Sequence, residues 1–469
     1  MGLRIMNVTI DMVVAATDGT LLASGSGIGF AGVCIDGKKM VPGGLFVAIR
    51  GERFDGHDFI DQAVAAGASG ALVARGRGQA SLRPGLTVVE VDDTVQALGR
   101  LAQAHRRAQT DLRVVGVAGS NGKTTTKELC AAVCVAALGA DSVLKTEGNL
   151  NNHLGVPLTL LRLEPQHRVA VVEMGMSALG ELAYLSNLVE ADIGVIVSIG
   201  VEHLEHLHTL ENIAQAEAEI LPSVKTAVLP LDEPLLKQHR DAAIGRGTTV
   251  LSFGGAGADV TVKVNHPDAS GVALSLGLPG GGTLDAHLPL VGAHNGVNAA
   301  AAVAVGLALG FAPHHLRAGL EAVRPAKHRA QLVPVGDRLV LDDCYNASPV
   351  SMHAAIDALV AAGKGHRKIA VLGDMLELGP DSAALHAELG TYAGSRVDAL
   401  LAMGHDAAHI VDAAKAAGAT ATLFETPEAL ADHAWSATGA GDVILVKASR
   451  GMRLERVIDQ LMLLSNKGP

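Results

Sequence analysis

The chain has 469 residues, 49% of them apolar and 18% charged, with a formal net charge of −11. The length predicts about three domains, and the apolar fraction excludes an intrinsically disordered chain. The acidic balance and the aromatic content of 2% argue against a general nucleic-acid binder, which needs a basic surface and rings for base stacking.

The N-terminal segment, the longest uncharged interval and the cysteines indicate the cellular compartment that we expect. Asp11 and Asp18 interrupt the apolar residues near the N-terminus, so no secretory pattern is present there. The longest uncharged interval, Ala286 to Leu316, is too weakly apolar to span a bilayer. Four scattered cysteines do not make a disulfide framework, and Cys130 and Cys134 fit one buried helix face. We expect a cytoplasmic monomer without nucleic-acid partners or stable membrane association.

The first 110 residues predict a small α/β domain. Apolar runs indicate strands over 44–49, 70–74 and 86–91, with helices over 58–66 and 94–109 between and after them.

A new α/β pattern begins after Asp111, and we assign 111–324 to a central domain. Continuous apolar strands over 112–118, 169–173 and 193–199 alternate with helices, the first over 124–137, which is typical of a mostly parallel sheet covered on both faces. Short alternating runs then predict hairpins, and a helix closes the domain; these segments are 259–264, 271–276 and 295–309.

A third pattern begins near Pro325 and extends to residue 469. Short apolar strands again alternate with Ala-rich helices, which predicts a doubly wound, Rossmann-like C-terminal domain. The expected strands are 338–342, 368–373, 399–403, 421–424 and 442–447.

The central domain opens with a phosphate-loop motif. Gly119-Ser-Asn-Gly-Lys-Thr124 follows a strand and precedes a helix, where backbone N–H groups and the helix N-terminus can bind phosphates. Lys123 can reach the β- and γ-phosphates, and the Thr124 hydroxyl can hold Mg²⁺. Gly116 is one residue too early for the common spacing, so an ordinary glycine-rich turn is the alternative reading. The sequence GKT in this position favours the phosphate-binding reading.

Three further side chains make up a candidate set of cation ligands. Glu173 ends an apolar strand, His203 follows the next one, and Glu217 lies on the helix that starts after Thr209. With the Thr124 hydroxyl they would suit one or two hard cations beside phosphates. Taken singly, Glu173 reads as a solvated cap and Glu217 as an exposed helix face. His206 and His208 add a zinc alternative, which the absence of a nearby cysteine disfavours.

Several longer motifs accompany this set. They are Gly119–Glu128, Gly148–Leu161 (GNLNNHLGVPLTLL), Glu173–Gly175, Ile199–Leu204, His294–Asn298, Asp342–Pro349 (DDCYNASP), Leu372–Gly379 (LGDMLELG), Val446–Arg450 and, near the N-terminus, Val41–Ile60. Together they resemble the Mur ligases, the ATP-dependent amide-forming enzymes of peptidoglycan precursor synthesis. DDCYNASP and LGDMLELG are similar to the motifs of the members that join D-alanyl-D-alanine to a UDP-N-acetylmuramoyl tripeptide.

The resemblance implies a three-domain enzyme that uses ATP and Mg²⁺, with the UDP-muramoyl peptide bound by the N-terminal domain. It implies catalytic roles for Lys123, Glu173, His203 and Glu217, and metal ligation by Thr124, Glu173, His203 and Glu217. The implied nucleotide contacts are Gly119, Ser120, Asn121, Gly122, Lys123, Thr124, Thr125, Asn295, Asn298, Arg329 and Asp343. The implied substrate contacts are Asp36, Asn151, Asn152, Asn346 and Lys447.

Four positions depart from the family pattern. Glu217 stands where many relatives carry a lysine that becomes a carbamate, and we hypothesise that it supplies a permanent carboxylate instead. Gly37 and Lys38 replace the hydroxyl and guanidinium that commonly contact the uridine nucleotide. His328 stands where a glycine usually precedes the arginine, here Arg329.

Two alternatives to this activity are kept. One is a related ligase with another acceptor, such as a different Mur step or a polyglutamate-type reaction. The other is a module that binds ATP without making an amide, against which Lys123, Thr124, Glu173 and His203 all argue.

Overall fold

The computed structural model describes residues 8–466 and arranges them in two compact units. The first unit covers 8–116, 140–176 and 180–192; the second covers 117–139, 177–179 and 193–466. Residues 1–7 and 467–469 lie outside the described part, and they include the start of the segment searched for a secretory pattern. Within 8–466, no helix is both long enough and apolar enough to cross a membrane.

A five-stranded sheet organises the N-terminal part of the first unit. Its order is β2 (Thr20–Ala23), β7 (Thr87–Val91), β6 (Gly70–Ala74), β5 (Leu45–Val47) and β4 (Val33–Cys34). The strands β4 to β7 pair in parallel, and β2 pairs antiparallel with β7. Its helices are α1 (Ile10–Thr17), α2 (Ile60–Ala65), α3 (Gly78–Ser81) and α4 (Thr94–Arg107), with a small ladder of β1 (Val8–Thr9) and β3 (Gly29–Phe30).

The rest of the first unit continues into the central part of the chain. Here the strand order is β8 (Arg113–Ala118), β10 (Val169–Glu173) and β9 (Val143–Lys145), accompanied by α6 (Gly155–Leu160) and α7 (Glu181–Val189). Every residue of β10 is buried, as expected for a parallel strand covered on both faces. The helix α4 contacts both α6 and α7.

The second unit begins with the helix α5 (Lys123–Leu138). Its strands follow the order β16 (Thr283–Leu288), β15 (Gly271–Gly277), β14 (Val260–Asp268), β13 (Thr249–Gly254), β12 (Thr226–Pro230) and β11 (Ile193–Ile196). The pairs from β11 to β14 are parallel, whereas β14, β15 and β16 form antiparallel hairpins, as predicted. The helices are α8 (Leu204–Leu207), α9 (Leu210–Glu217), α10 (Lys237–Gly245), α11 (Asn295–Ala308) and α12 (Pro313–Ala322).

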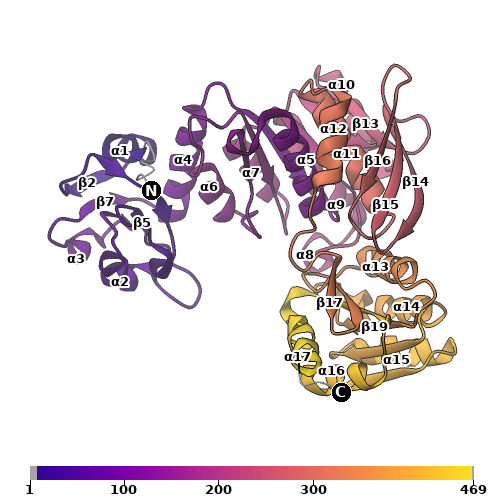
Figure 1. The fold of residues 1–469 in the computed structure, drawn as a ribbon. Helices are drawn as coiled ribbons and strands as arrows, with labels where there is room; N and C mark the ends of the chain where they lie inside the picture. The colour runs from indigo at the N-terminus through magenta and orange to yellow at the C-terminus, as the bar shows by residue number, and fades with distance from the viewer. Residues whose placement is uncertain (1–7, 467–469) are drawn as a thin grey trace. The chain divides into compact units, whose positions relative to one another are not determined.

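Distant segments meet around α5 in this unit. Both α11 and α12 pack against α5, although they follow it by more than 150 residues in the chain (Figure 1). Cys130 and Cys134 are fully buried on α5, which confirms their predicted place in the core. Small side chains allow this close helix packing; a Cβ at Gly319 of α12 would lie 2.4 Å from the Cα of Val133.

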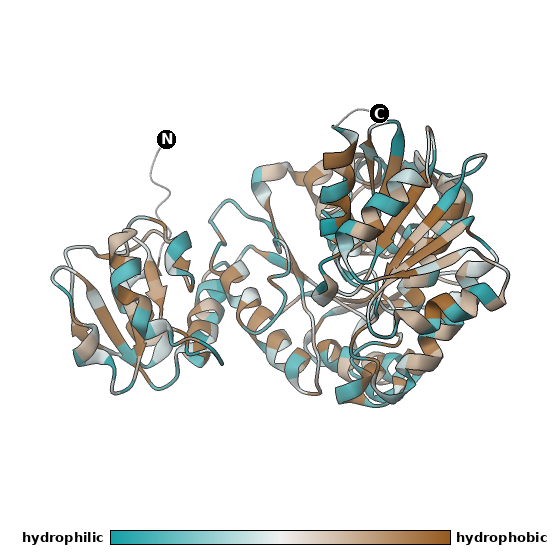
Figure 2. Ribbon diagram, turned by 90° about the horizontal axis from the view of Figure 1, so that it is seen from below, coloured by the Kyte–Doolittle hydropathy of each residue, from teal (hydrophilic) through white to brown (hydrophobic). Residues whose placement is uncertain are grey.

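The C-terminal part of the second unit is a six-stranded sheet covered on both faces. The strand order is β17 (Gln331–Val335), β18 (Arg338–Asp342), β22 (Val443–Lys447), β19 (Lys368–Gly373), β20 (Ala399–Met403) and β21 (Ala421–Phe424). Two apolar clusters lie on opposite faces, and the strands are the most hydrophobic segments (Figure 2). The covering helices are α13 (Pro349–Ala362), α14 (Ser382–Gly394), α15 (Ala407–Ala416), α16 (Pro427–Ser436) and α17 (Glu455–Ser465).

The α/β class, the mostly parallel central sheet and the doubly wound C-terminal sheet are thus confirmed. Some element ends differ from expectation. The strand predicted over 193–199 ends at Ile196, because the backbone and the hydroxyl of Ser198 bind the loop after β8 instead of extending the ladder. The helix predicted over 58–66 is a 3₁₀ turn (Gly56–Phe59) followed by the short α2, and the strand predicted over 44–49 is shortened to β5.

Candidate functional site

The loop between β8 and α5 has a backbone that requires glycine at two positions. Gly119 and Gly122 have φ angles of +120° and +82°, in the region that favours glycine. A Cβ at Gly119 would lie 2.7 Å from the backbone N of Val197, and one at Gly122 would lie 2.5 Å from Oδ1 of Asn298. Gly122 is also the N-cap of α5 and has no side chain to cover the helix N-terminus. The loop therefore presents a helix N-terminus to an anion, as the sequence predicts.

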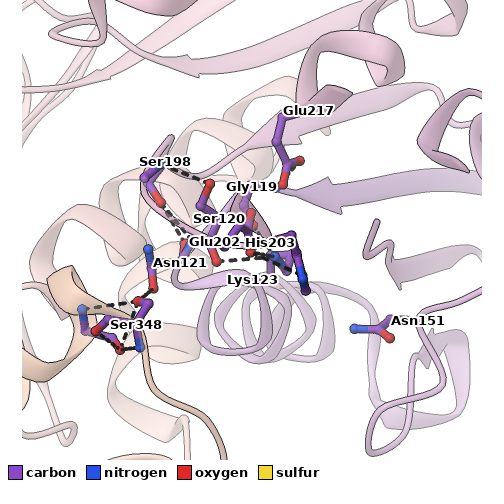
Figure 3. A network of polar contacts seen from close by, with 12 residues as sticks. Gly119, Ser120, Asn121, Lys123, Asn151, Ser198, Glu202, His203, Glu217 and Ser348 are labelled. Atoms are coloured by element: carbon purple, nitrogen blue, oxygen red, sulfur yellow. Dashed lines mark hydrogen bonds and ion pairs between the residues drawn. The ribbon is translucent and has the colours of Figure 1, made fainter. Parts of the chain in front are cut away.

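Lys123 lies over this loop (Figure 3). Its ammonium donates hydrogen bonds to the carbonyl oxygens of Gly119 and, at 3.3 Å, Ser120, and it lies 3.4 Å from Oε2 of Glu202. The side chain is about one-sixth exposed, so its charge is held close to the loop and is little screened.

Side chains from distant segments fix the loop in place. The backbone N–H of Asn121 donates to Oγ of Ser198 at 3.0 Å, and the Ser198 hydroxyl donates to the carbonyl of Asn121 at 3.0 Å. The N–H of Gly200 donates to Oγ of Ser120 at 3.0 Å. The hydroxyl of Ser348, which also caps α13, donates to Oδ1 of Asn121 at 2.7 Å. Ser120 and Asn121, predicted as nucleotide contacts, therefore hold the loop's shape through their side chains.

Two carboxylates meet beneath the loop. Glu217 is 1% exposed, and its Oε2 accepts the N–H of Gly119 at 2.6 Å. The Oε1 atoms of Glu217 and Glu202 are both buried and have no hydrogen-bond partner among the described residues. Burial raises the pKa of Glu217 to about 8; the positive charge of Lys123 opposes this rise, and the neighbouring charge of Glu202 adds to it. The reading of Glu217 as an exposed helix face is therefore wrong.

His203 contacts an acidic residue from the loop that follows β19. Its Nδ1 lies 2.5 Å from Oε2 of Glu377, and its Nε2 lies 3.9 Å from Oε2 of Glu202. His203 and Glu377 both adopt positive φ angles, +49° and +65°, so both side chains are set by strained turns.

Glu173, Asn151 and Asn152 belong to the first unit. Glu173 is 2% exposed at the end of β10, and Nδ2 of Asn151 donates to its Oε1 at 2.9 Å. The reading of Glu173 as a solvated cap is therefore wrong. Asn152 uses Oδ1 to accept the N–H groups of Leu154 and Gly155 at 3.2 and 2.9 Å, which stabilises the start of α6.

The start of α11 places two asparagines against the loop. Asn295 and Asn298 are 2% and 6% exposed, and Nδ2 of Asn298 donates to Oδ1 of Asn295 at 3.1 Å. Nδ2 of Asn295 donates to the carbonyl of Val291 at 2.8 Å. Oδ1 of Asn298 packs on the face of Gly122, so this amide lies directly behind the phosphate loop. Thr125, another predicted nucleotide contact, is half-buried in the first turn of α5.

The C-terminal part contributes the polar side chains of Arg329, Asp343 and Lys447, of which Arg329 lies near the phosphate loop. Nη2 of Arg329 lies 3.4 Å from the hydroxyl of Thr124, and the guanidinium stacks 4.0 Å above the ring of Tyr345. The carboxylate of Asp343 accepts the N–H of Ala330 at 3.0 Å and the ammonium of Lys447 at 2.6 Å.

Asn346 joins this group through its backbone carbonyl, which accepts the Lys447 ammonium at 2.9 Å. Asp36, in the first unit, accepts the N–H of Lys38 at 3.0 Å and caps the 3₁₀ turn Gly37–Lys39. Its side chain therefore has a local structural role as well as its predicted contact with substrate.

Sequence reasoning missed four members of the site: Ser198, Glu202, Ser348 and Glu377. Glu202 was detectable, because it directly precedes His203 in the loop that follows β11. Glu377 lies inside LGDMLELG, a motif that the sequence singles out without assigning its glutamate. Ser198 and Ser348 carry no local signal, since each acts through a contact with a residue at least 77 positions away.

Comparison with known proteins accounts for this arrangement. Three family models match: Mur ligase family, catalytic domain, over 29–106; Mur ligase middle domain, over 117–306; and Mur ligase, glutamate ligase domain, over 328–450. The UDP-N-acetylmuramoyl-tripeptide–D-alanyl-D-alanine ligase of Bacillus subtilis is 36% identical, over 92% of this chain and 93% of its own length.

Two solved structures are similar along nearly the whole chain. A crystal structure of MurF from Acinetobacter baumannii has a TM-score of 0.87 and 31% identity, covering 98% of this chain and 100% of its own. MurF ligase from Thermotoga maritima, in complex with ADP, has a TM-score of 0.80 and 30% identity, covering 93% and 98%. The chain belongs to the Mur ligase family.

Proposed function

We propose that this enzyme joins a UDP-N-acetylmuramoyl tripeptide to D-alanyl-D-alanine at the expense of ATP. The observation that carries the proposal is the phosphate loop, with Lys123 held over it and Glu202 and Glu217 beneath it, in a chain similar from end to end to ligases of that name. The product would be the pentapeptide precursor of peptidoglycan, so the activity serves cell wall synthesis and, through it, cell shape and division.

The reaction requires activation of a carboxylate. A carboxylate oxygen of the tripeptide attacks the γ-phosphorus of ATP, which forms an acyl phosphate and releases ADP. The free amine of D-alanyl-D-alanine then attacks the acyl carbon, the amide bond forms and phosphate leaves with the original carboxylate oxygen. Lys123 and the N-terminus of α5 stabilise negative charge on the transferred phosphoryl group. Positioning of the two substrates supplies the rest of the rate acceleration.

The donor set fits Mg²⁺. Glu202 and Glu217 each present a buried carboxylate oxygen that lacks a hydrogen-bond donor, and hard cations prefer such oxygens. We assign Thr124, Glu173, His203 and Glu217 as ligands, and we add Glu202 because its buried Oε1 has no hydrogen-bond partner among the described residues. When bound, Mg²⁺ neutralises phosphate charge. Glu217 would supply a carboxylate without a CO₂ adduct once a bound Mg²⁺ has displaced its proton, and a bridging water would fill the length that a carbamylated lysine spans.

The nucleotide and substrate contacts follow from the same assignment. We propose that Asn295, Asn298, Arg329 and Asp343 contact the nucleotide from two sides of the loop. Gly119, Ser120, Asn121, Gly122 and Thr125 shape the phosphate site. Asp36, Asn151 and Asn152 are assigned to the muramoyl peptide, and Asn346 and Lys447 to the incoming dipeptide.

We further propose three functional domains over 1–110, 111–324 and 325–469. The contacts assigned to ATP come from the second and third, so domain closure around the substrates is expected. The enzyme is proposed to act as a cytoplasmic monomer without nucleic-acid partners. Small-angle scattering that gave identical dimensions with and without ATP and peptide substrate would contradict closure.

An omission assay tests the proposed reaction. Phosphate release is measured with ATP, Mg²⁺, UDP-N-acetylmuramoyl tripeptide and D-alanyl-D-alanine, each left out in turn. We expect turnover only in the complete mixture. Turnover that requires glutamate or a free amino acid in place of the dipeptide would instead identify a ligase with another acceptor.

A further inference from the structure

A cluster of three metal-ligating side chains lies outside the phosphate site. His328 lies in the loop before β17, while Asp342 and Cys344 lie at the end of β18. One candidate ligand atom from each residue lies within 4.8 Å of the other two. Asp342 and Cys344 are 4% and 1% exposed, and the His328 side chain is 19% exposed, so the cluster is enclosed but open on the histidine side.

The candidate ligand atoms already lie close together, with His328 next to one carboxylate oxygen of Asp342 and Cys344 next to the other. Nδ1 of His328 lies 2.7 Å from Oδ2 of Asp342, Sγ of Cys344 lies 3.0 Å from Oδ1 of Asp342, and Sγ lies 3.7 Å from Nδ1. A tetrahedral zinc ion, with bonds of about 2.3 Å to sulfur and about 2.0 Å to nitrogen and oxygen, separates its ligands by about 3.3–3.5 Å. Each of these three separations, two of them to different oxygens of Asp342, is within about 0.6 Å of that spacing.

The surroundings favour a cation. Burial, with the charges of Asp342, Glu455 and Asp343, raises the pKa of the Cys344 thiol well above its usual range. Oε2 of Glu455 is itself buried and has no hydrogen-bond partner among the described residues. Asp343 is paired with Lys447 and Glu455 with Arg450, so the negative charge beside the sulfur is mainly that of Asp342, and a bound divalent metal would neutralise it.

We propose that His328, Asp342 and Cys344 bind a zinc-class divalent cation, with water as the fourth ligand. The nitrogen, oxygen and sulfur donors suit zinc or cobalt, whereas Mg²⁺ prefers oxygen alone. On binding, the sulfur–hydrogen bond breaks, the sulfur–metal bond forms and one proton passes to solvent. The imidazole ligates through Nδ1 and keeps its proton on Nε2.

The metal would restrain two segments that we assign to the nucleotide. Arg329 follows His328 directly, and Asp343 follows Asp342. One ion bound by His328 and Asp342 would therefore hold the backbone of both nucleotide-contacting residues in place. The site also explains a departure from the family pattern, because the histidine occupies the position where a glycine usually precedes the arginine. The proposal stands apart from the ligase assignment, since metal binding is measured without any substrate.

Cobalt spectroscopy of the full-length protein tests the site. With excess Mg²⁺ present to fill sites made only of oxygen, Co²⁺ is added and the sulfur-to-cobalt charge-transfer band is recorded. We expect one thiolate-bound cobalt per chain in the wild type. Cys344→Ser, which keeps a hydroxyl able to donate to Asp342, should lose the band, and His328→Gly should weaken binding by at least about 10-fold.

Matched variants separate this site from other thiols and histidines. Cys34→Ser removes the half-exposed cysteine of the first unit and should leave the band unchanged. Replacing His206 and His208, which are exposed near the phosphate site, with asparagine should also leave it unchanged. Absence of the band in the wild type, its persistence in Cys344→Ser, or its loss in Cys34→Ser would each overturn the proposal.

Discussion

The phosphate loop and the loop before β17 solve the same backbone problem with different residues. In the phosphate loop, Gly119 and Gly122 adopt positive φ angles where a Cβ has no room. In the second loop, His328 adopts a φ of +61°, and a hydrogen bond from its ring to Asp342 accompanies the strained backbone. The first solution leaves a helix N-terminus bare for an anion. The second places an imidazole where glycine would place nothing, and so creates a ligand.

The phosphate loop can be predicted from the sequence, whereas the role of His328 cannot. Glycine at a left-handed position is a local requirement, so its spacing predicts the turn. A histidine there has meaning only through Asp342, which lies 14 residues away. Substitutions in the two loops, and at Glu217, which lies beside Glu202 under the phosphate loop, can test this difference.

The largest effect is expected from Lys123→Ala. Removing the ammonium that lies over the loop should lower phosphate release by at least about 100-fold, because that charge stabilises the negative charge on the transferred phosphoryl group. Steady-state phosphate release measures it. Lys237→Ala, at a strongly exposed lysine of α10, is the control and should keep wild-type turnover. Wild-type turnover in Lys123→Ala would contradict the catalytic assignment.

Gly122→Ala should weaken nucleotide binding and destabilise the fold by about 1–3 kcal/mol. Alanine is strained at the φ of +82° that Gly122 adopts, and its Cβ would also clash with the amide oxygen of Asn298. Gly180→Ala, at the N-cap of α7, has a similar left-handed backbone (φ +88°, ψ −18°) with no atom within 4 Å of the new Cβ, so it isolates the backbone cost. Calorimetric titration with ADP should show a loss of affinity only in Gly122→Ala. Equal affinities in the two variants would show that the contact with Asn298 is unimportant.

Glu217→Gln should flatten the pH dependence of stability in the absence of divalent cations. The folded pKa of Glu217 is about 8, against 4.5 for an ordinary glutamate, so its stabilising contribution is complete below pH 4.5 and is lost as pH rises through 8. The slope is up to about 1.4 kcal/mol per pH unit. Denaturant unfolding in EDTA across this window measures it.

Glu211→Gln, at an exposed position on the same helix, is the matched control and should keep the wild-type slope. A wild-type slope in Glu217→Gln would contradict the buried acid pair. Glu217→Gln should also lower turnover at limiting Mg²⁺, and full activity there would refute its assignment as a metal ligand.

The smallest effect is expected from His328→Gly in metal-free protein. Relief of the left-handed backbone is worth about 1–2 kcal/mol, and loss of a hydrogen bond to a carboxylate costs about 1.5–3 kcal/mol, so we expect net destabilisation of about 1 kcal/mol. His266→Gly relieves a similar φ of +46° at an exposed position, so it should not destabilise. Thermal unfolding of both variants gives the comparison. Stabilisation by His328→Gly would mean that the bond to Asp342 contributes little.

Much of the molecule was predictable because its signals are local. Continuous apolar strands fixed the order of the α/β elements, and Gly119–Thr124 predicted the loop. Glu202 was marked only by its place beside His203, and Glu377, in a loop, had no periodic signal. Their contacts with Lys123 and His203 depend on the fold. The burial of Glu217 was equally hidden, since its neighbours Ala216 and Ala218 fit a buried or an exposed helix face alike.

Isotope transfer tests the central claim of the proposed reaction. The tripeptide is labelled with ¹⁸O in its reacting carboxylate, and the phosphate released during ligation to D-alanyl-D-alanine is analysed by mass spectrometry. We expect one labelled oxygen in each phosphate, because the acyl phosphate carries a carboxylate oxygen to phosphorus. Unlabelled phosphate formed together with the ligated product would contradict the proposed route.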